Sequence, residues 1–300
     1  MSLDQHLRLL SRTIDPIVLG SRIRNARLVR GLTQAELGDP AASSAYICRI
    51  EAGQRRPGVE LLQHIATRAE TTVEALVLGI DRDRLDELSL ALSRADLLLA
   101  SGRTTAASAM ASRVVDEFGE TPLTDLTDEA DRIRAMAMLD AGRPAAAART
   151  LQRLLDSGAL AGRSLQLRTA LCRAYLAQGE LEQAVKVGEL GLDLVEQYGL
   201  HGLPESIELV LALADVQLAL GDQAEARSLC LQALDAAGNL DDGARLGTAY
   251  WHASATETRR GATELARRHA ERALGLLELD RFHSNVASLR ERVNEYTPAL

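Results

Sequence analysis

The stretch LCRAYLAQGELEQAVKVGELG, residues 171–191, decides the fold of the larger part of this chain. Leu and Ala recur on both sides of Gly179, and Ala184 follows that glycine by five residues. A glycine at the end of a helical pattern supplies the left-handed conformation that closes a helix, and a small residue lets a second helix approach closely. The stretch therefore predicts two helices joined by a turn at Gly179.

The same arrangement recurs five times along the chain. The pairs are Gly102 with Ala107, Gly142 with Ala147, Gly179 with Ala184, Gly221 with Ala226, and Gly261 with Ala266. Successive glycines are 40, 37, 42 and 40 residues apart. In three units a further small residue follows the alanine by seven positions, namely Gly191, Ala233 and Ala273. Self-similarity at such a period predicts an array of stacked helical hairpins.

These units resemble the tetratricopeptide repeat, although they are longer than its standard unit. Residues 171–191 match it best, with Cys172 in the small position and Tyr175 in the aromatic position of the first helix. The resemblance implies a right-handed α-solenoid of five hairpins, in which the first helix of each pair lines a concave groove. The segment LDRFHSNVASLRERVNEY, residues 279–296, has no partner helix, so we expect it to cap the array.

The register of the repeats selects the side chains that should point into the groove. They are Asp96, Arg132, Met136, Thr169, Arg173, Asp215, Trp251 and Arg259. A groove with both charges and the single Trp could hold an extended peptide. The alternative for each residue is that it is solvated or serves only in packing.

Composition and charge divide the chain. Hydrophobic residues make up 46 % of the 300 residues and aromatic residues only 3 %, which favours an all-α chain long enough for two domains. Residues 1–80 carry a balance of +2, whereas residues 81–300 carry −10. We therefore predict an N-terminal domain over residues 1–80 and the repeats over residues 81–300. Within residues 21–56 seven arginines stand against three acidic residues, a balance of +4. Such a local basic patch on an acidic protein is a candidate contact for nucleic acid.

Residues 19–79 predict about five short helices. We expect Ser21 to cap the first helix, whose apolar positions are Ile23, Leu28 and Val29 and whose end is Gly31. Thr33 and Glu36 have capping-box spacing at the second helix. Ser43 should cap the third helix, in which Tyr46, Ile47 and Ile50 share one face and which Gly53 ends. Two further apolar stripes complete the bundle: Leu61, Leu62, Ile65 and Ala66, then Val73, Leu76 and Leu78.

Four segments of this region, LGSRIRNAR (19–27), GLTQAEL (31–37), SAYICRIEAGQRRP (44–57) and LLQHIA (61–66), resemble the lambda-repressor-like, or Xre-type, helix-turn-helix family. The resemblance implies binding to double-stranded DNA and a structural ion pair between Arg27 and Glu51. It also implies a set of DNA-facing residues on the second helix, the third helix and the loop after it: Gln34, Ser43, Ser44, Ala45, Arg49, Arg55 and Arg56.

One segment departs from the family pattern. GDPAAS, residues 38–43, is one residue shorter than the usual turn and contains Pro40. We therefore expect either that the second helix ends early or that the third helix lies at a changed angle.

The order of the two domains resembles the peptide-responsive bacterial transcription regulators grouped as RRNPP. That resemblance implies a homodimer on an inverted-repeat operator, and a short quorum-sensing peptide in the groove that changes how the two DNA-binding domains are held. Two alternatives stay open. The repeats could bind a partner protein as a scaffold beside a vestigial helix-turn-helix, or they could only dimerise a constitutive DNA-binding regulator.

The remaining patterns argue against catalysis, metals and membranes. The sequence contains no G-x-S-x-G, P-loop or H-E-x-x-H, so we expect no enzyme. Cys48, Cys172 and Cys230 form no C-x-x-C pair, and the acidic run at 124–131 is interpreted as a capped, solvated helix start, so we expect neither metal nor cofactor. No apolar run approaches about 18 residues. We expect a cytoplasmic protein without membrane contact.

Overall fold

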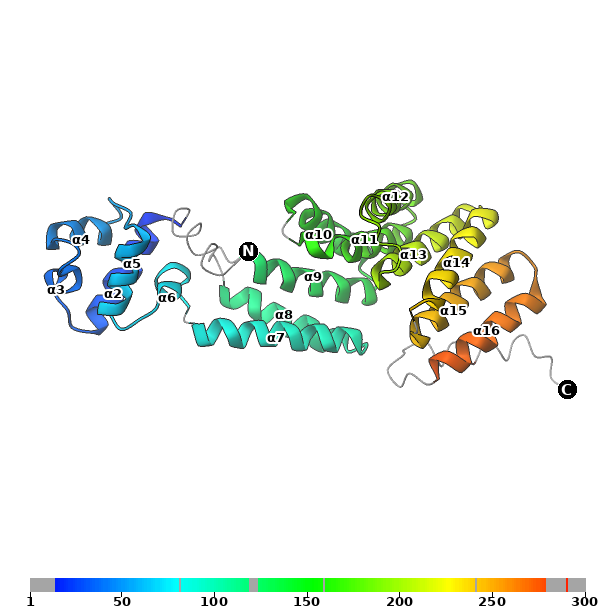
Figure 1. The fold of residues 1–300 in the computed structure, drawn as a ribbon, viewed down its shortest axis with the longest axis horizontal. Coiled ribbons are helices and arrows are strands. Elements are labelled where there is room, and N and C mark those ends of the chain that lie inside the picture. The colour runs from blue at the N-terminus through cyan, green and yellow to red at the C-terminus, as the bar shows by residue number, and fades with distance from the viewer. Residues whose placement is uncertain are drawn as a thin grey trace. The chain divides into compact units, whose positions relative to one another are not determined.

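A computed structural model describes residues 14–80, 82–118, 124–158, 160–240, 242–278 and 290. All regular secondary structure in these residues is helical, which confirms the all-α class (Figure 1). Contacts divide the chain into two compact units: residues 1–93 with 113–127, and residues 94–112 with 128–300. The domain boundary at residue 80 stays a prediction.

The first unit contains a five-helix helix-turn-helix bundle. Its helices are α2 (Pro16–Val29), α3 (Gln34–Gly38), α4 (Ser44–Glu51), α5 (Val59–Arg68) and α6 (Val73–Leu78). All five helices contribute large aliphatic side chains to one core: Leu19, Ile23, Leu37, Ile47, Ile50, Leu62, Ile65, Leu76 and Leu78. We call α2–α6 the helix-turn-helix bundle below.

The predicted ends of the short helices are confirmed, with one exception. The Thr33 hydroxyl accepts from the Glu36 backbone N–H, Ser43 caps α4, and Gly31 and Gly53 have positive φ angles of 69° and 72°. α3 has only five residues and ends before Pro40, which is the first of the two outcomes expected for the shortened turn.

The predicted start of α2 was wrong. The helix begins at Pro16 after the cap Asp15, whose carboxylate accepts from the Ile17 backbone N–H at 2.7 Å, because an acidic cap followed by proline is a stronger start than Ser21. Leu28 and Val29, predicted as apolar positions of this helix, are 54 % and 84 % exposed. Leu19, Ile23 and Arg27, four residues apart, form the inner face instead, and an ion pair takes the last position of that face.

The second unit holds the repeats. Their helices are α9 (Thr124–Asp140), α10 (Pro144–Ser157), α11 (Ser164–Gln178), α12 (Leu181–Tyr198), α13 (Pro204–Leu220), α14 (Gln223–Gly238), α15 (Gly243–Arg259) and α16 (Thr263–Leu277), with a short 3₁₀ turn at Ala161–Arg163. The division between the units falls inside α7 (Arg82–Ala100), α8 (Thr104–Phe118) and the first turn of α9. The repeat array below means α9–α16 with the ends of α7 and α8 that meet at Gly102.

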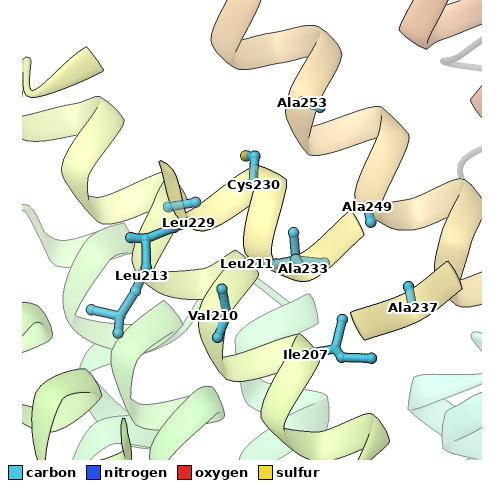
Figure 2. Close-up of a cluster of buried hydrophobic side chains, with 11 residues drawn as sticks. Ile207, Val210, Leu211, Leu213, Leu229, Cys230, Ala233, Ala237, Ala249 and Ala253 are labelled. Atoms are coloured by element: carbon cyan, nitrogen blue, oxygen red, sulfur yellow. The ribbon is translucent and has the colours of Figure 1, made fainter. Parts of the chain in front are cut away.

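The repeat register is confirmed at every unit. The five predicted glycines have φ between +68° and +89°. The five alanines that follow them are fully buried: Ala107, Ala147, Ala184, Ala226 and Ala266. Small side chains at these crossings let neighbouring helices pack closely, as expected of a solenoid built from hairpins. Figure 2 shows such packing where Val210 of α13, Cys230 of α14 and Ala253 of α15 meet in one buried cluster.

Four further expectations concern the C-terminal cap, the acidic run at 124–131, membrane spans and metal sites. The predicted C-terminal cap lies outside the described residues, apart from Arg290. The acidic run is only partly solvated, since Asp128 is buried and pairs with Arg153 at 3.1 Å. In the residues that the structure describes, no helix is long and apolar enough to cross a membrane, and no three His, Cys, Asp or Glu side chains form a metal site.

Candidate functional sites

The third helix of the bundle, α4, is held by a buried ion pair. Arg27 Nε lies 2.6 Å from Glu51 Oε1, and a second guanidinium nitrogen lies 3.0 Å from Oε2, so the contact is bidentate. Arg27 also donates to the Leu32 carbonyl at 2.9 Å, and Gln34 donates to Glu51 Oε2 at 2.9 Å. The predicted pair is confirmed, and it ties α2, α3 and α4 together.

The electrostatics of this network follow from its geometry. Burial favours the neutral acid at Glu51, but hydrogen bonds from Arg27 and Gln34 outweigh it and hold the pKa of this carboxyl below its ordinary value. Glu51 is therefore ionised, and it keeps its partners in place at neutral pH.

A close backbone approach fixes α4 against α2. A Cβ atom on Gly20 would lie 2.3 Å from the carbonyl oxygen of Ile50 and 2.8 Å from that of Glu51. Real Cβ atoms do not approach a backbone oxygen this closely, so only glycine fits at position 20 without moving a helix.

The opposite side of α4 is open. Ile47 and Ile50 are buried in the bundle core, whereas the residues on the other side are exposed: Ser43, Ser44, Ala45, Cys48 and Arg49. Arg55 and Arg56 are exposed in the loop that follows. The structure thus brings together six of the seven residues predicted to face DNA. The seventh, Gln34, is half-buried, and its amide supports Glu51.

Sequence reasoning missed Cys48 on this surface. It lies four residues after Ser44 and next to Arg49, so the helical period alone would have placed it on the exposed side.

The second candidate site is a groove of about 540 Å³ along the first helices of the repeats. Five of the eight predicted residues line it: Asp96, Arg132, Met136, Thr169 and Arg173. Sequence reasoning missed four polar neighbours: Asp140, Arg163, Gln166 and Glu208. The helical period carried the signal for two of them, since Asp140 follows Met136 by four residues and Gln166 precedes Thr169 by three.

One end of this groove is a closed cluster of charges. The Arg132 side chain is only 4 % exposed and lies 2.5 Å from Asp96 and 2.8 Å from Glu129. Arg163 lies 3.0 Å from the same Glu129. Two guanidinium groups and two carboxylates therefore neutralise one another, and little charge is left at this end for a ligand.

The other end of the groove has charged groups that are not neutralised in this way. Arg173 is exposed and has no carboxylate within 4 Å among the described residues, and within the same residues neither Asp140 nor Glu208 has a basic group at that distance. Burial raises the pKa of Asp140, while the positive charge of Arg173 opposes that rise. These groups remain available to bind a charged ligand.

The remaining three predicted residues lie outside this groove. Asp215 lies 2.8 Å from Nδ1 of His252. Trp251 is half-buried against Ala273 and Leu277 of α16, and Arg259 is exposed in the last turn of α15. Their role in ligand binding stays a prediction.

Two kinds of comparison with known proteins bear on these sites. The tetratricopeptide repeat model matches residues 129–153, 165–185 and 208–232, which fall on α9–α10, α11–α12 and α13–α14. No curated protein sequence matches this chain.

Solved structures reproduce the fold at low sequence identity. Bacillus thuringiensis PlcR in complex with the peptide PapR7 and DNA is 17 % identical, with a TM-score of 0.58 over 91 % of this chain and 99 % of that chain. The apo form of PlcR is 17 % identical, with a TM-score of 0.57 over 92 % of this chain and 98 % of that chain. TTC0263, a thermophilic tetratricopeptide protein of Thermus thermophilus, is 22 % identical, with a TM-score of 0.53 over 70 % and 98 %. The repeat array thus has a tetratricopeptide-like fold, and the whole chain is similar in fold to PlcR.

Proposed function

We propose that this protein is a sequence-specific DNA-binding transcription regulator whose repeat array dimerises and senses a short peptide. The observation that carries the proposal is the exposed side of α4, which the Arg27–Glu51–Gln34 network and the Gly20 contact hold in a fixed orientation. A rigid helix with a polar outer face and basic residues beside it is suited to the major groove of DNA.

The exposed arginines have two different roles in this proposal. The Arg49 guanidinium, in the last turn of α4, reads a base edge, for which a bidentate contact to guanine is the commonest choice. Arg55 and Arg56 contact phosphates, which position the protein without reading sequence. Because a single bundle covers a short half-site, a homodimer on an inverted repeat with half-sites about 34 Å apart provides the specificity.

The groove of the array receives the peptide. Arg173 binds a carboxylate of the ligand, and Asp140 and Glu208 bind an ammonium or guanidinium group, since none of these three side chains has an ion-pair partner within 4 Å among the described residues. The ligand changes DNA binding only if it binds the competent and incompetent arrangements of the dimer with different affinity. The PlcR complex, which holds both a peptide and DNA on a similar fold, supports this combination.

The DNA part is tested with an operator selected from a random duplex library. Binding of the full chain is then measured by fluorescence anisotropy over a range of salt concentrations. Arg49→Ala should lose about 1–3 kcal/mol of binding free energy and relax base preference. Arg55→Ala should instead weaken binding to all DNA sequences alike and lower the slope of log affinity against log salt concentration by about one. Arg149→Ala, an exposed arginine of α10, is the matched control. Unchanged binding in both bundle variants would favour the scaffold alternative.

The peptide part is tested by screening peptides for a rise in melting temperature and then for a change in operator affinity. Arg173→Ala should weaken the response to an active peptide while leaving DNA affinity without peptide unchanged. A full response in this variant places the peptide elsewhere, and a screen without any active peptide favours the constitutive alternative.

A further inference from the structure

A second cavity, of about 730 Å³, lies on the repeat array where α10, α11, α12 and α13 meet. Its walls are mainly apolar and include Leu154 and Leu155 of α10, Leu194 and Tyr198 of α12, and Leu200 and Leu203 of the following link. Sites for small molecules have volumes of about 300–1,000 Å³ and mostly apolar walls. This cavity has the size and lining of such a site.

The cavity exists because two links at this end of the array are long. α10 ends at Ser157 and α11 begins at Ser164, and α12 ends at Tyr198 while α13 begins at Pro204. At the other end of the hairpins the links are short: residues 179–180 join α11 to α12, and residues 221–222 join α13 to α14. The longer links leave apolar side chains uncovered, so that Tyr198 is 64 % exposed and Leu203 is 42 % exposed.

One charged group in the cavity wall has no partner among the described residues. The Nε atom of Arg168 is buried without a hydrogen-bond acceptor, and no described carboxylate lies within 4 Å of its guanidinium group. The two other charged residues of the described lining are engaged, since Arg163 pairs with Glu129 and Glu205 accepts from Gln166 at 3.2 Å. A buried donor without an acceptor is costly. Nε itself is not accessible, so an anionic acceptor would bind the terminal nitrogens of the same guanidinium group, which are not buried in this way.

Packing holds Arg168 at this position. A Cβ on Gly191 of α12 would lie 3.4 Å from Cδ of Arg168, so the arginine stem crosses α12 where that helix has no side chain. Its apolar stem therefore lies along the wall of the cavity while the guanidinium group keeps donors for a ligand.

We propose that this cavity binds a small apolar monocarboxylate, with its hydrocarbon chain among the leucines and Tyr198 and its carboxylate on Arg168. The site goes beyond the proposed function, because neither DNA nor peptide binding requires it. It borders the peptide groove at Arg163 and Gln166, which line both.

The experiment measures binding of hexanoate, decanoate and tetradecanoate to the full chain by isothermal titration calorimetry below their micellar concentrations. We expect saturable binding of one decanoate per chain, about tenfold tighter than binding of decanol, because a charge-assisted hydrogen bond requires the carboxylate. Arg168→Gln should weaken decanoate about tenfold and abolish its advantage over decanol. Ala161→Trp, which fills the cavity from an exposed position of its wall, should abolish binding of both.

Arg149→Gln, an exposed arginine of α10 outside the cavity, should bind decanoate like the unmodified chain. Circular dichroism checks the fold of each variant, and Arg168→Gln alone decides the proposal if Ala161→Trp does not fold. The proposal would be overturned if decanoate showed no saturable binding, if decanoate and decanol bound with equal affinity, or if Arg168→Gln bound decanoate as tightly as the unmodified chain. Preference for acetylated leucyl-leucine over every fatty carboxylate would also overturn it, in favour of a peptide carboxyl terminus. Operator binding is measured in a separate experiment, so a failure of the proposed DNA binding would not affect the test of this cavity.

Discussion

The helix-turn-helix bundle and the repeat array stabilise their helices in different ways. The bundle helices have 5 to 14 residues, and four of the five begin with a side-chain cap: Asp15, Thr33, Ser43 and Thr72. The helices α10–α16 have 14 to 18 residues, and five of these seven have no side-chain cap. Short helices have few internal hydrogen bonds to offset the free-energy cost of helix nucleation, so the capping of their ends contributes a larger share of their stability.

The closest contacts of the two regions also differ. In the bundle, Gly20 meets the backbone oxygen of Ile50, whereas in the array a Cβ on Gly188 would lie 2.3 Å from Cδ2 of Leu213, which is a side-chain atom. A leucine can change rotamer, but a carbonyl oxygen of a helix cannot move without the helix. The bundle is therefore one interlocked unit, and the array is a series of neighbour contacts that absorb local changes.

The largest effect is expected at Gly20. Gly20→Ala should destabilise the bundle by more than about 3 kcal/mol and abolish operator binding, because the added methyl group forces α2 and α4 apart. Gly58→Ala is the control for the steric effect, since a Cβ there meets nothing within 4 Å; because Gly58 is the N-cap of α5, this variant should show only the smaller cost of a poorer cap. Hydrogen exchange with mass spectrometry reports the stability of each region in the full chain. Equal protection of the bundle in both variants would break the comparison.

The second largest effect on stability is expected at the Arg27–Glu51 ion pair between α2 and α4. Arg27→Ala should cost the bundle about 3 kcal/mol, because it leaves the Glu51 carboxylate, whose side chain is 4 % exposed, without its cation. Protection of the array amides in the same sample is the internal control. A loss that appears equally in the array would mean that the two regions do not unfold separately.

The same pair predicts a dependence on pH. The pKa of Glu51 is lower in the folded bundle than in the unfolded chain, where a glutamate has a pKa of about 4.3. Its contribution is therefore complete above that value and is lost as the pH falls through the lowered folded pKa. Acid titration of bundle protection should show this loss, and Arg27→Ala should remove most of it.

A smaller effect is expected in the array at Gly188. Gly188→Ala should cost about 1–2 kcal/mol, since Leu213 can move aside at the expense of packing. Gly238→Ala, where nothing lies within 4 Å, is the matched control on α14. The loss of amide protection from hydrogen exchange should be confined to α12 and α13. A cost as large as that of Gly20→Ala would contradict the difference between backbone and side-chain contacts.

The sequence predicted the features that depend on local chemistry. The capping box at Thr33 and the cap at Ser43 are present because hydroxyl groups followed by free N–H groups need no tertiary contact to form. The glycines of the repeat were predictable for the same reason, because a left-handed residue is required wherever two helices join so closely.

Features that depend on partners far along the chain were not predictable. Arg132 and Arg173 occupy neighbouring repeats and have the same residue type, yet one is paired with Asp96 across 36 residues and the other is exposed. Trp251, predicted to face the groove, is half-buried against Ala273 and Leu277 of α16, a contact that was not predicted because the sequence pattern does not fix which neighbour a half-buried side chain covers. The apolar cavity arises from the lengths of two links, which no single motif records.

The smallest expected effect compares two N-caps. Thr33→Ala removes the capping box of the five-residue α3, and Asp222→Ala removes the cap of the sixteen-residue α14. Such a cap contributes about 1 kcal/mol on average. We expect Thr33→Ala to cost at least this much and to weaken operator binding, because α3 has little else to fix its first turn and carries Gln34 at its start. Asp222→Ala should cost less, since packing against α13 and α15 holds α14 along its length. Hydrogen exchange of both variants measures the difference, and an equal or larger cost at Asp222 would show that helix length does not decide the weight of a cap in this protein.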